Sequence, residues 1–108
     1  MRIRSERIKK AKLKGTHTKK EWHELKSFFN CCVKCEGKNG LKNIEKDHII
    51  PIYQGGSDSI TNIQPFCAKC NASKGHEIID WRKIYCQKHN ITMPTMWLIS
   101  ESKSGLRI

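Results

Sequence analysis

The chain has 108 residues, of which 37% are hydrophobic. This length and composition indicate one small domain whose hydrophobic core alone gives little stability. Its formal net charge of +11, from 21 Lys and Arg residues against 10 Asp and Glu residues, indicates a polyanionic partner, most often nucleic acid. No stretch approaches the roughly 20 apolar residues of a membrane span, no amphipathic apolar face accompanies the charge, and no apolar signal-peptide core follows Met1. We therefore expect a soluble, cytoplasmic protein with no membrane partner.

Residues 1–17 are interpreted as a basic N-terminal arm. Seven Lys and Arg residues stand there against Glu6 alone, and the apolar positions fit neither a helix face nor a strand. We expect the arm to lie along a phosphate backbone and to become helical once its charge is neutralised; a solvated tail is the alternative. The arm residues expected to contact the backbone are Arg4, Arg7, Lys9 and Lys10.

A helix is predicted from Thr18 to about Asn30. Thr18 and Glu21 have the spacing of a capping box, in which each side chain bonds to the other residue's backbone N–H. Apolar residues then recur at helical spacing, which predicts one buried face.

Four of the six cysteines form two C-x-x-C pairs, Cys32 with Cys35 and Cys67 with Cys70. Two residues between thiolates let a tight turn aim both sulfurs at one ion, and two such turns complete a tetrahedral zinc shell. The pattern therefore predicts a structural zinc. Cys31 is an alternative to Cys32 through a C-x-x-x-C spacing, and Cys86 is expected to be a buried thiol.

The remaining elements follow from turn residues and apolar spacing. An extended stretch is predicted from Leu41 to Ile52, and a short strand from Ile63 to Phe66 with Pro65 at an edge or strand end. Helices are predicted over residues 68–74, stopped or kinked at Gly75, and over residues 77–89. The packing of residues 91–108 is not predicted.

Asp47, His48, Asn62 and Asn71 lie between or beside the two cysteine pairs and have the chemistry of phosphodiester hydrolysis. Histidine is the side chain with an ordinary pKa near 7 and can take a proton from water. A carboxylate and an amide oxygen suit Mg²⁺ or Mn²⁺. Because neighbouring strand residues point to opposite faces, Asp47 and His48 can face one point only if the strand twists or bulges, for which the tight turn from Pro51 to Gly56 is a plausible place. A phosphate at the strand edge, between the metal and the base, would remove this requirement.

The stretches "DHIIPI", "GGSDSITN" and "CAKCNASKG", framed by "CVKCEG", resemble the HNH endonuclease family. The resemblance implies a small α+β fold with a ββα-metal core, stapled by a zinc site of four cysteines and flanked by helices. It also implies three parts: the arm at 1–17, a nuclease domain at 18–90 and a C-terminal extension at 91–108.

The resemblance also implies the roles of single residues. His48 would be the general base, and Asn62 would brace the loop between the strands through backbone hydrogen bonds. Asp47 and Asn71 would hold one catalytic divalent ion, with Mg²⁺ or Mn²⁺ favoured because Asn replaces the family's frequent His. Lys74 would contact phosphate, and His76 is a further candidate, with a solvated histidine as its alternative.

The implied activity is hydrolysis of DNA to 5′-phosphate and 3′-hydroxyl ends, in a bacterial or phage-infected cell. A homodimer and a phage packaging protein are possible partners in this family, and RNA stays open as a substrate. A non-catalytic zinc ribbon that binds nucleic acid explains the charge and the cysteines equally well, and only the set Asp47, His48, Asn62 and Asn71 separates the two.

Overall fold

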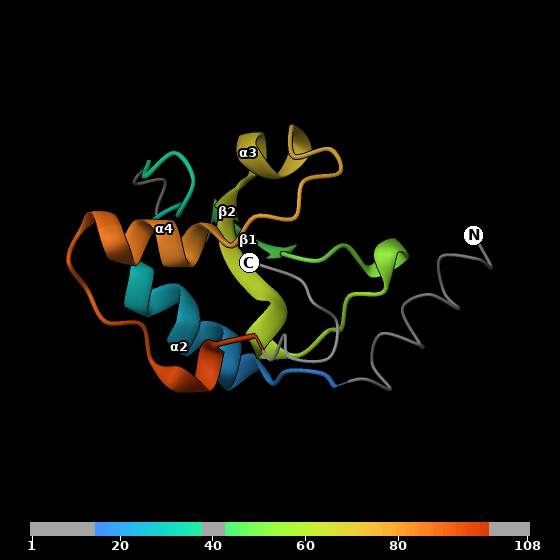
Figure 1. Cartoon of the computed structure of the whole chain (residues 1–108), viewed down its shortest axis with the longest axis horizontal. Helices are drawn as coiled ribbons and strands as arrows, with labels where there is room; N and C mark the ends of the chain where they lie inside the picture. Colours follow the sequence, from blue (N-terminus) through green and yellow to red (C-terminus); the bar gives the residue numbers. More distant parts are fainter. Residues whose placement is uncertain (1–14, 38–42, 100–108) are drawn as a thin grey trace.

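The structure is a computed structural model that describes residues 15–37 and 43–99 (Figure 1). The predicted arm residues Arg4, Arg7, Lys9 and Lys10 lie outside the described residues, as do residues 100–108 of the predicted extension. The helices and strands, in chain order, are α2 (Lys19–Phe29), β1 (Ile44–His48), β2 (Ile63–Cys67), α3 (Ala68–Ala72) and α4 (Trp81–Lys88). Short 3₁₀ turns lie at Ile52–Gln54, Ile60–Asn62 and Thr95–Trp97.

Helix α2 begins where the sequence predicts it. The Thr18 hydroxyl oxygen accepts a hydrogen bond from the Glu21 N–H at 3.0 Å, and the Glu21 carboxylate accepts one from the Thr18 N–H at 2.9 Å. The helix ends at Asn30, whose φ of 57° is the left-handed conformation that often closes a helix. Leu25 and Phe29 are buried, so the predicted capping box and apolar face are both confirmed.

Strands β1 and β2 form a two-stranded antiparallel sheet in which Asp47 lies opposite Gln64 and His48 opposite Ile63. The pairing is continuous, one residue against one, from Ile44 to His48. A bulge at the Asp47–His48 step is therefore excluded, and the two side chains lie on opposite faces of a regular strand. β1 stops at His48, short of the predicted end at residue 52, and the chain bends at Ile49.

Helix α3 ends at Ala72, two residues before the predicted end. Its first turn is capped by a thiol, because the Cys67 sulfur accepts the Cys70 N–H. The predicted stop at Gly75 is therefore wrong: the helix has already ended when the chain reaches this glycine, whose φ of 67° lies in the left-handed region that glycine adopts without the clash of a Cβ.

Helix α4 begins at Trp81, not at residue 77. The Asp80 carboxylate accepts the Arg82 N–H at 3.0 Å and so caps the helix there. The Trp81 N–H donates to the side-chain oxygen of Gln64 at 2.9 Å, which joins this helix start to β2.

Helices α2 and α4 lie side by side against the hairpin, and α3 follows at the end of β2 (Figure 1). Phe29 of α2 meets Tyr85 of α4 edge to face, with ring centroids 5.6 Å apart. Trp97 is only 3% exposed and packs on Phe28, with centroids 5.0 Å apart. The first part of the predicted C-terminal extension therefore belongs to the same core as α2.

The result is a small α+β fold, as predicted, with β1, β2 and α3 in ββα order and α2 and α4 flanking them. Within residues 15–37 and 43–99, no helix combines the length and the hydropathy that crossing a bilayer requires.

Candidate metal centre and active site

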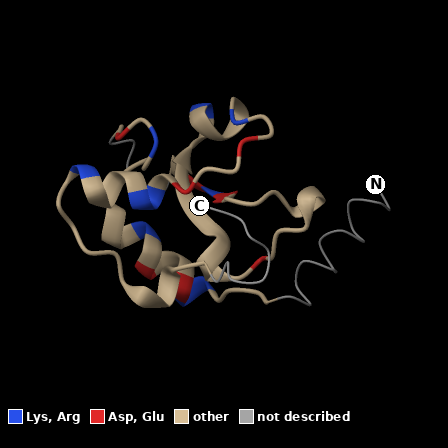
Figure 2. Cartoon of the chain, in the orientation of Figure 1, with Lys and Arg blue, Asp and Glu red and all other residues tan. Residues whose placement is uncertain are grey.

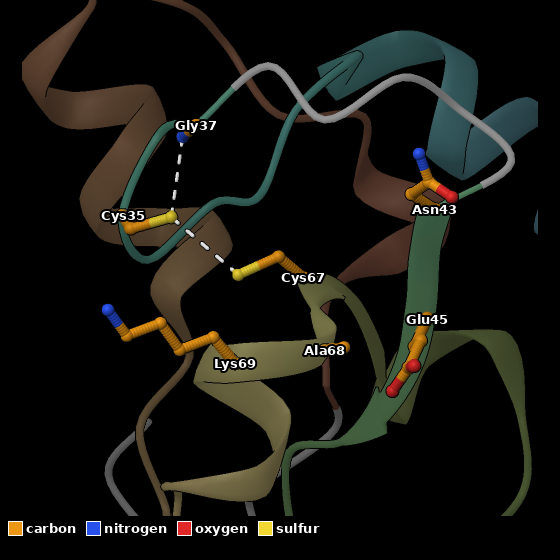
Figure 3. Close-up of a pocket in the computed structure, with 7 residues that line it drawn as sticks. All are labelled: Cys35, Gly37, Asn43, Glu45, Cys67, Ala68 and Lys69. Atoms are coloured by element: carbon orange, nitrogen blue, oxygen red, sulfur yellow. Dashed lines mark hydrogen bonds between the residues drawn. The ribbon is translucent and has the colours of Figure 1, made fainter.

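The fold brings the two cysteine pairs together. The Sγ atoms of Cys32, Cys35, Cys67 and Cys70 all lie within 4.8 Å of one another. Those of Cys35 and Cys67 are 3.8 Å apart (Figure 3). Zn–S bonds of about 2.3 Å in a tetrahedron put the sulfurs about 3.8 Å apart, so the four thiols fit a structural zinc.

Backbone N–H groups point at two of these sulfurs. Gly37 donates to Cys35 and Cys70 donates to Cys67, each at 3.4 Å. The bond from Cys70 is the main reason why the pKa of the Cys67 thiol falls to about 7, and a thiolate is the form that binds zinc. Cys31 lies outside the cluster and burial raises its pKa, so the alternative ligand set with Cys31 is wrong.

Asp47 is held inside the fold by two side chains. Its Oδ2 accepts hydrogen bonds from Gln64 at 2.8 Å and from Lys74 at 3.0 Å, and the side chain is 5% exposed. Its Oδ1 has no donor among the described residues. Every fully buried polar side-chain atom in that part of the chain has a hydrogen-bond partner, so Oδ1 is not fully buried. One carboxylate oxygen is therefore fixed by the protein, while no described residue donates to the other.

Gln64 was not predicted as a site residue, although the sequence carries a signal for it. It is the one polar residue of β2 (IQPFC), apart from the cysteine that ends the strand, and its side chain is 0% exposed. A buried amide needs partners, and Gln64 finds them in Asp47, in the Ile79 carbonyl at 3.2 Å and in the Trp81 N–H. It connects the acidic side chain of β1 to the start of α4.

The two described candidates for phosphate contact lie in different surroundings. The Lys74 ammonium has three N–H donors, and its three partners are Asp47 and the carbonyls of His48 and Ile49. With 8% of its side chain exposed, Lys74 differs from the predicted surface contact. His76 is exposed and is hydrogen bonded to the Tyr53 hydroxyl.

Asn71 lies in α3, the helix that packs along β1. Its Nδ2 donates to the Glu45 carboxylate at 2.9 Å. Glu45 and Asp47 are two positions apart on β1 and share the face that α3 covers. Glu45 holds the amide nitrogen, and no described residue donates to the Asn71 carbonyl oxygen. With Oδ1 of Asp47, this oxygen makes a donor set that suits Mg²⁺ or Mn²⁺.

A pocket of about 630 Å³ opens between the cysteine cluster and β1 (Figure 3). Its lining includes Cys35, Cys67, Lys69 and Glu45. Glu45 lines this pocket and is also hydrogen bonded to Asn71. The cysteine cluster therefore lies near the predicted metal ligand Asn71, on the same side of the domain.

His48 ends β1 with its ring on the face opposite to Asp47. Its Nε2 lies 2.9 Å from Oδ1 of Asp58, a residue that was not predicted as part of the site. The only sequence signal for Asp58 was one acidic residue in a polar loop, ten positions after His48, and nothing in the spacing points that carboxylate at the histidine.

Asn62 has the backbone hydrogen bonds predicted for it. Its Oδ1 accepts the Ile50 N–H at 2.9 Å, and its Nδ2 donates to the carbonyls of Ile50 at 3.0 Å and Ser57 at 2.8 Å. Because the amide replaces a strand partner for Ile50, the chain leaves the sheet just after His48. Asn62 thus fixes both ends of the loop that follows the proposed base.

Arg82 holds the backbone on both sides of Asn62 in place. Its guanidinium is 0% exposed and donates to the Asp80 carboxylate at 2.9 and 3.0 Å. It also donates to the carbonyls of Thr61 at 2.9 Å and Ile63 at 3.2 Å, which flank Asn62. A buried ion pair whose donors are directed at acceptors holds this turn in one geometry.

The loop leaves no room for a side chain at Gly56. A Cβ there would lie 1.8 Å from the Ile50 carbonyl oxygen and 2.9 Å from Asn62 Nδ2, whereas a Cβ at Gly75 meets nothing within 4 Å. We expect Gly56→Ala to lower the free energy of unfolding by more than about 3 kcal/mol, the upper end for an overpacked site. Gly75→Ala, which costs only the strain of a left-handed backbone, is expected to lower it by about 1–2 kcal/mol.

Urea unfolding of the zinc-loaded protein, followed by Trp fluorescence, measures both glycine variants. Equal losses for Gly56→Ala and Gly75→Ala would contradict the tight packing of this loop.

The arrangement has the parts of a hydrolytic site on a rigid frame. A carboxylate oxygen and an amide oxygen come from the facing elements β1 and α3, and an imidazole paired with a carboxylate stands at the strand end. Such a set can hold a divalent cation and take a proton from water.

Part of the chain matches a known protein family. The sequence model described as HNH endonuclease matches residues 32–83, from the first cysteine of the cluster into α4. A search of curated proteins finds no match to the chain. The matched segment contains the whole cysteine cluster, both strands and α3, which confirms the resemblance inferred from the sequence. Residues 32–83 therefore match the HNH endonuclease family.

Proposed function

We propose that the protein is an endonuclease that hydrolyses DNA phosphodiester bonds with one divalent ion, Mg²⁺ or Mn²⁺. Asp47 and Asn71 hold the ion, His48 is the general base, and the zinc held by the cysteine cluster is structural. One site cuts one strand, so double-strand cutting takes two copies of the chain or two successive nicks.

The main support is a pair of side-chain oxygens, one from Asp47 and one from Asn71, to which no described residue donates a hydrogen bond. Asp47 Oδ2 is held by Gln64 and Lys74, and Asn71 Nδ2 is held by Glu45. The second oxygen of Asp47 and the carbonyl oxygen of Asn71 are left for a cation between β1 and α3. Because the amide ligand is neutral, the ion stays more positive than it would with two carboxylates.

The chain's own residues supply the proton transfer and the frame. His48 takes a proton from the attacking water, while Asn62 holds the loop after His48 in place. The bound ion would stabilise the charge that develops on the phosphate. Lys and Arg residues on α2, α3 and α4 (Figure 2) give affinity for the phosphate backbone. The basic residues of the N-terminal sequence add to it.

One observation favours the rival, a zinc-stabilised module that binds nucleic acid without cutting it. The Lys74 ammonium lies 3.0 Å from Asp47, so a positive charge of the protein already neutralises this carboxylate. An ion must therefore bind to a carboxylate that shares its charge with Lys74. Only a cutting assay separates the two functions.

We expect the zinc-loaded protein to nick supercoiled plasmid when Mg²⁺ or Mn²⁺ is added, and to bind the plasmid without nicking it when both ions are left out. The divalent ion is omitted and not chelated, because a chelator also removes zinc. DNA ligase should reseal the nicked product, since the expected ends are 5′-phosphate and 3′-hydroxyl. Binding without nicking under every divalent ion tested would favour the rival.

A single-stranded RNA of matched length, tested beside the plasmid, decides the nucleic-acid class. Equal or faster cutting of RNA would overturn DNA as the substrate and leave the chemistry unchanged.

A further inference from the structure

Asp58 is the only acidic side chain bonded to the His48 ring in the part of the chain that the structure describes. Oδ1 of Asp58 lies 2.9 Å from Nε2 of His48, and the two side chains are 15% and 26% exposed. The contact is therefore partly shielded from water, which makes its geometry better defined than that of a surface ion pair.

Three consecutive residues before α2 fix Asp58 in place. The Asp58 N–H donates to the Gly15 carbonyl at 3.2 Å, and Oδ2 accepts the Thr16 hydroxyl at 2.8 Å. The Asp58 carbonyl accepts a hydrogen bond from Nδ1 of His17 at 2.7 Å. Both the backbone and the second carboxylate oxygen are thus held, and Oδ1 is left for His48.

The donor in the His48 contact follows from chemistry. Burial alone raises the pKa of the Asp58 carboxyl, but the hydrogen bonds from His48 and Thr16 outweigh it and the pKa lies below its ordinary value. An ionised carboxylate only accepts hydrogen bonds, so Nε2 of His48 must carry the hydrogen. In the neutral ring the lone pair is then on Nδ1.

We propose that Asp58 is the positioning residue of His48: it holds the ring by Nε2–H and so makes Nδ1 the nitrogen that takes the proton from water. This inference rests on the proposed function of His48 as the base.

The proton and the electron pairs balance in this step. The water O–H bond breaks and its proton goes to Nδ1, while the oxygen forms the new bond to phosphorus. The P–O3′ bond breaks with its electron pair on O3′, which takes a proton from a second water, and the hydroxide left behind later recovers a proton from the His48 imidazolium. The imidazolium formed on His48 then faces the Asp58 carboxylate, which stabilises it without taking the proton, as in other His–Asp pairs.

The first test reads the ring directly and needs no cutting. Ring ¹⁵N spectra of the zinc-loaded protein are recorded well above the ordinary histidine pKa, with the His48 signals assigned by their loss in His48→Ala. We expect His48 as the Nε2–H form in wild type and a mixture of both tautomers in Asp58→Asn. A wild-type ring in the Nδ1–H form overturns the inference even if the enzyme cuts DNA.

The second test is kinetic. We expect Asp58→Asn to lower kcat on the order of 10²-fold with KM unchanged, at the lower end of what acid–base catalysis contributes. Glu77→Gln is the matched control with the same change of charge, because Glu77 forms an exposed ion pair with Lys34 at 3.4 Å. It should cut like wild type.

Thr16→Val separates positioning from a purely structural role, because it removes one anchor of Asp58 and leaves the His48 contact in place. A positioning role predicts a much smaller loss for Thr16→Val than for Asp58→Asn. Equal losses in the two variants, or Asp58→Asn cutting within twofold of wild type, would overturn the inference. If wild type does not cut at all, the proposed function fails, while the tautomer result still stands by itself.

Discussion

Removal of zinc from the cysteine cluster is expected to unfold the protein. Structural zinc contributes on the order of 10–16 kcal/mol in small zinc peptides, which exceeds the roughly 5–15 kcal/mol net stability of an ordinary domain. The cluster also joins distant parts of this fold, since Cys32 and Cys35 follow α2 while Cys67 and Cys70 join β2 to α3. Without the ion, four thiols would face one another, and the contact between α3 and β1 would rest on few bonds, such as the one from Asn71 to Glu45.

Far-UV circular dichroism during titration with a strong chelator, with zinc per chain measured in parallel, checks this. We expect helix signal and zinc to be lost together and to return when zinc is added back. Cys67→Ser should behave like the metal-free protein because it removes one ligand.

Cys86→Ser is the matched control. Cys86 is a thiol of α4 that is 4% exposed and lies outside the cluster. It should keep one zinc per chain and lose only about 1–3 kcal/mol for burying a hydroxyl. A chelated wild-type protein with an unchanged spectrum would show that the hydrophobic core is sufficient without metal.

Local chemistry made several parts of this structure predictable. The capping box at Thr18 and Glu21 needs only side chains three residues apart, and the C-x-x-C turns need only two residues between their sulfurs. The start of α2 and the cysteine cluster were therefore predicted correctly. The hydrogen bonds of Asn62 were predicted from the family resemblance. The local sequence Thr-Asn-Ile alone does not indicate that this side chain bonds across the loop.

Long-range polar partners were not predictable in the same way. The end of β1 depends on Asn62 replacing a strand partner, and the start of α4 depends on Gln64 and Asp80. Local spacing favoured longer elements at both places, and tertiary contacts overrode it.

The same limit applies to the candidate site. The spacing of the motif put Asp47 and His48 next to each other but said nothing of their separate partners, Lys74 on one face and Asp58 on the other. The family resemblance predicted that Lys74 contacts phosphate, which requires an exposed side chain, and lysine is seldom buried. Burial became possible because a carboxylate and two backbone carbonyls take all three of its donors.

His48→Ala is expected to lower the nicking rate by about 10²–10⁴-fold, the usual contribution of a general base. The ring is at the end of β1 and 26% exposed, so its removal leaves no large cavity and should change the free energy of unfolding little. Plasmid affinity should stay within about twofold, since the substitution removes none of the Lys and Arg residues that bind phosphate.

The measurement is the initial rate of plasmid nicking with saturating Mg²⁺ or Mn²⁺, beside a binding assay at the same salt concentration. His23→Ala is the matched control: His23 is an exposed histidine on α2 whose ring contacts Ser27, at 3.5 Å. If both variants nick like wild type, the proton goes elsewhere and the base is not His48. If both lose activity together with zinc, the loss reports folding. Only a loss confined to His48→Ala, with binding and zinc retained, assigns the proton transfer to this ring.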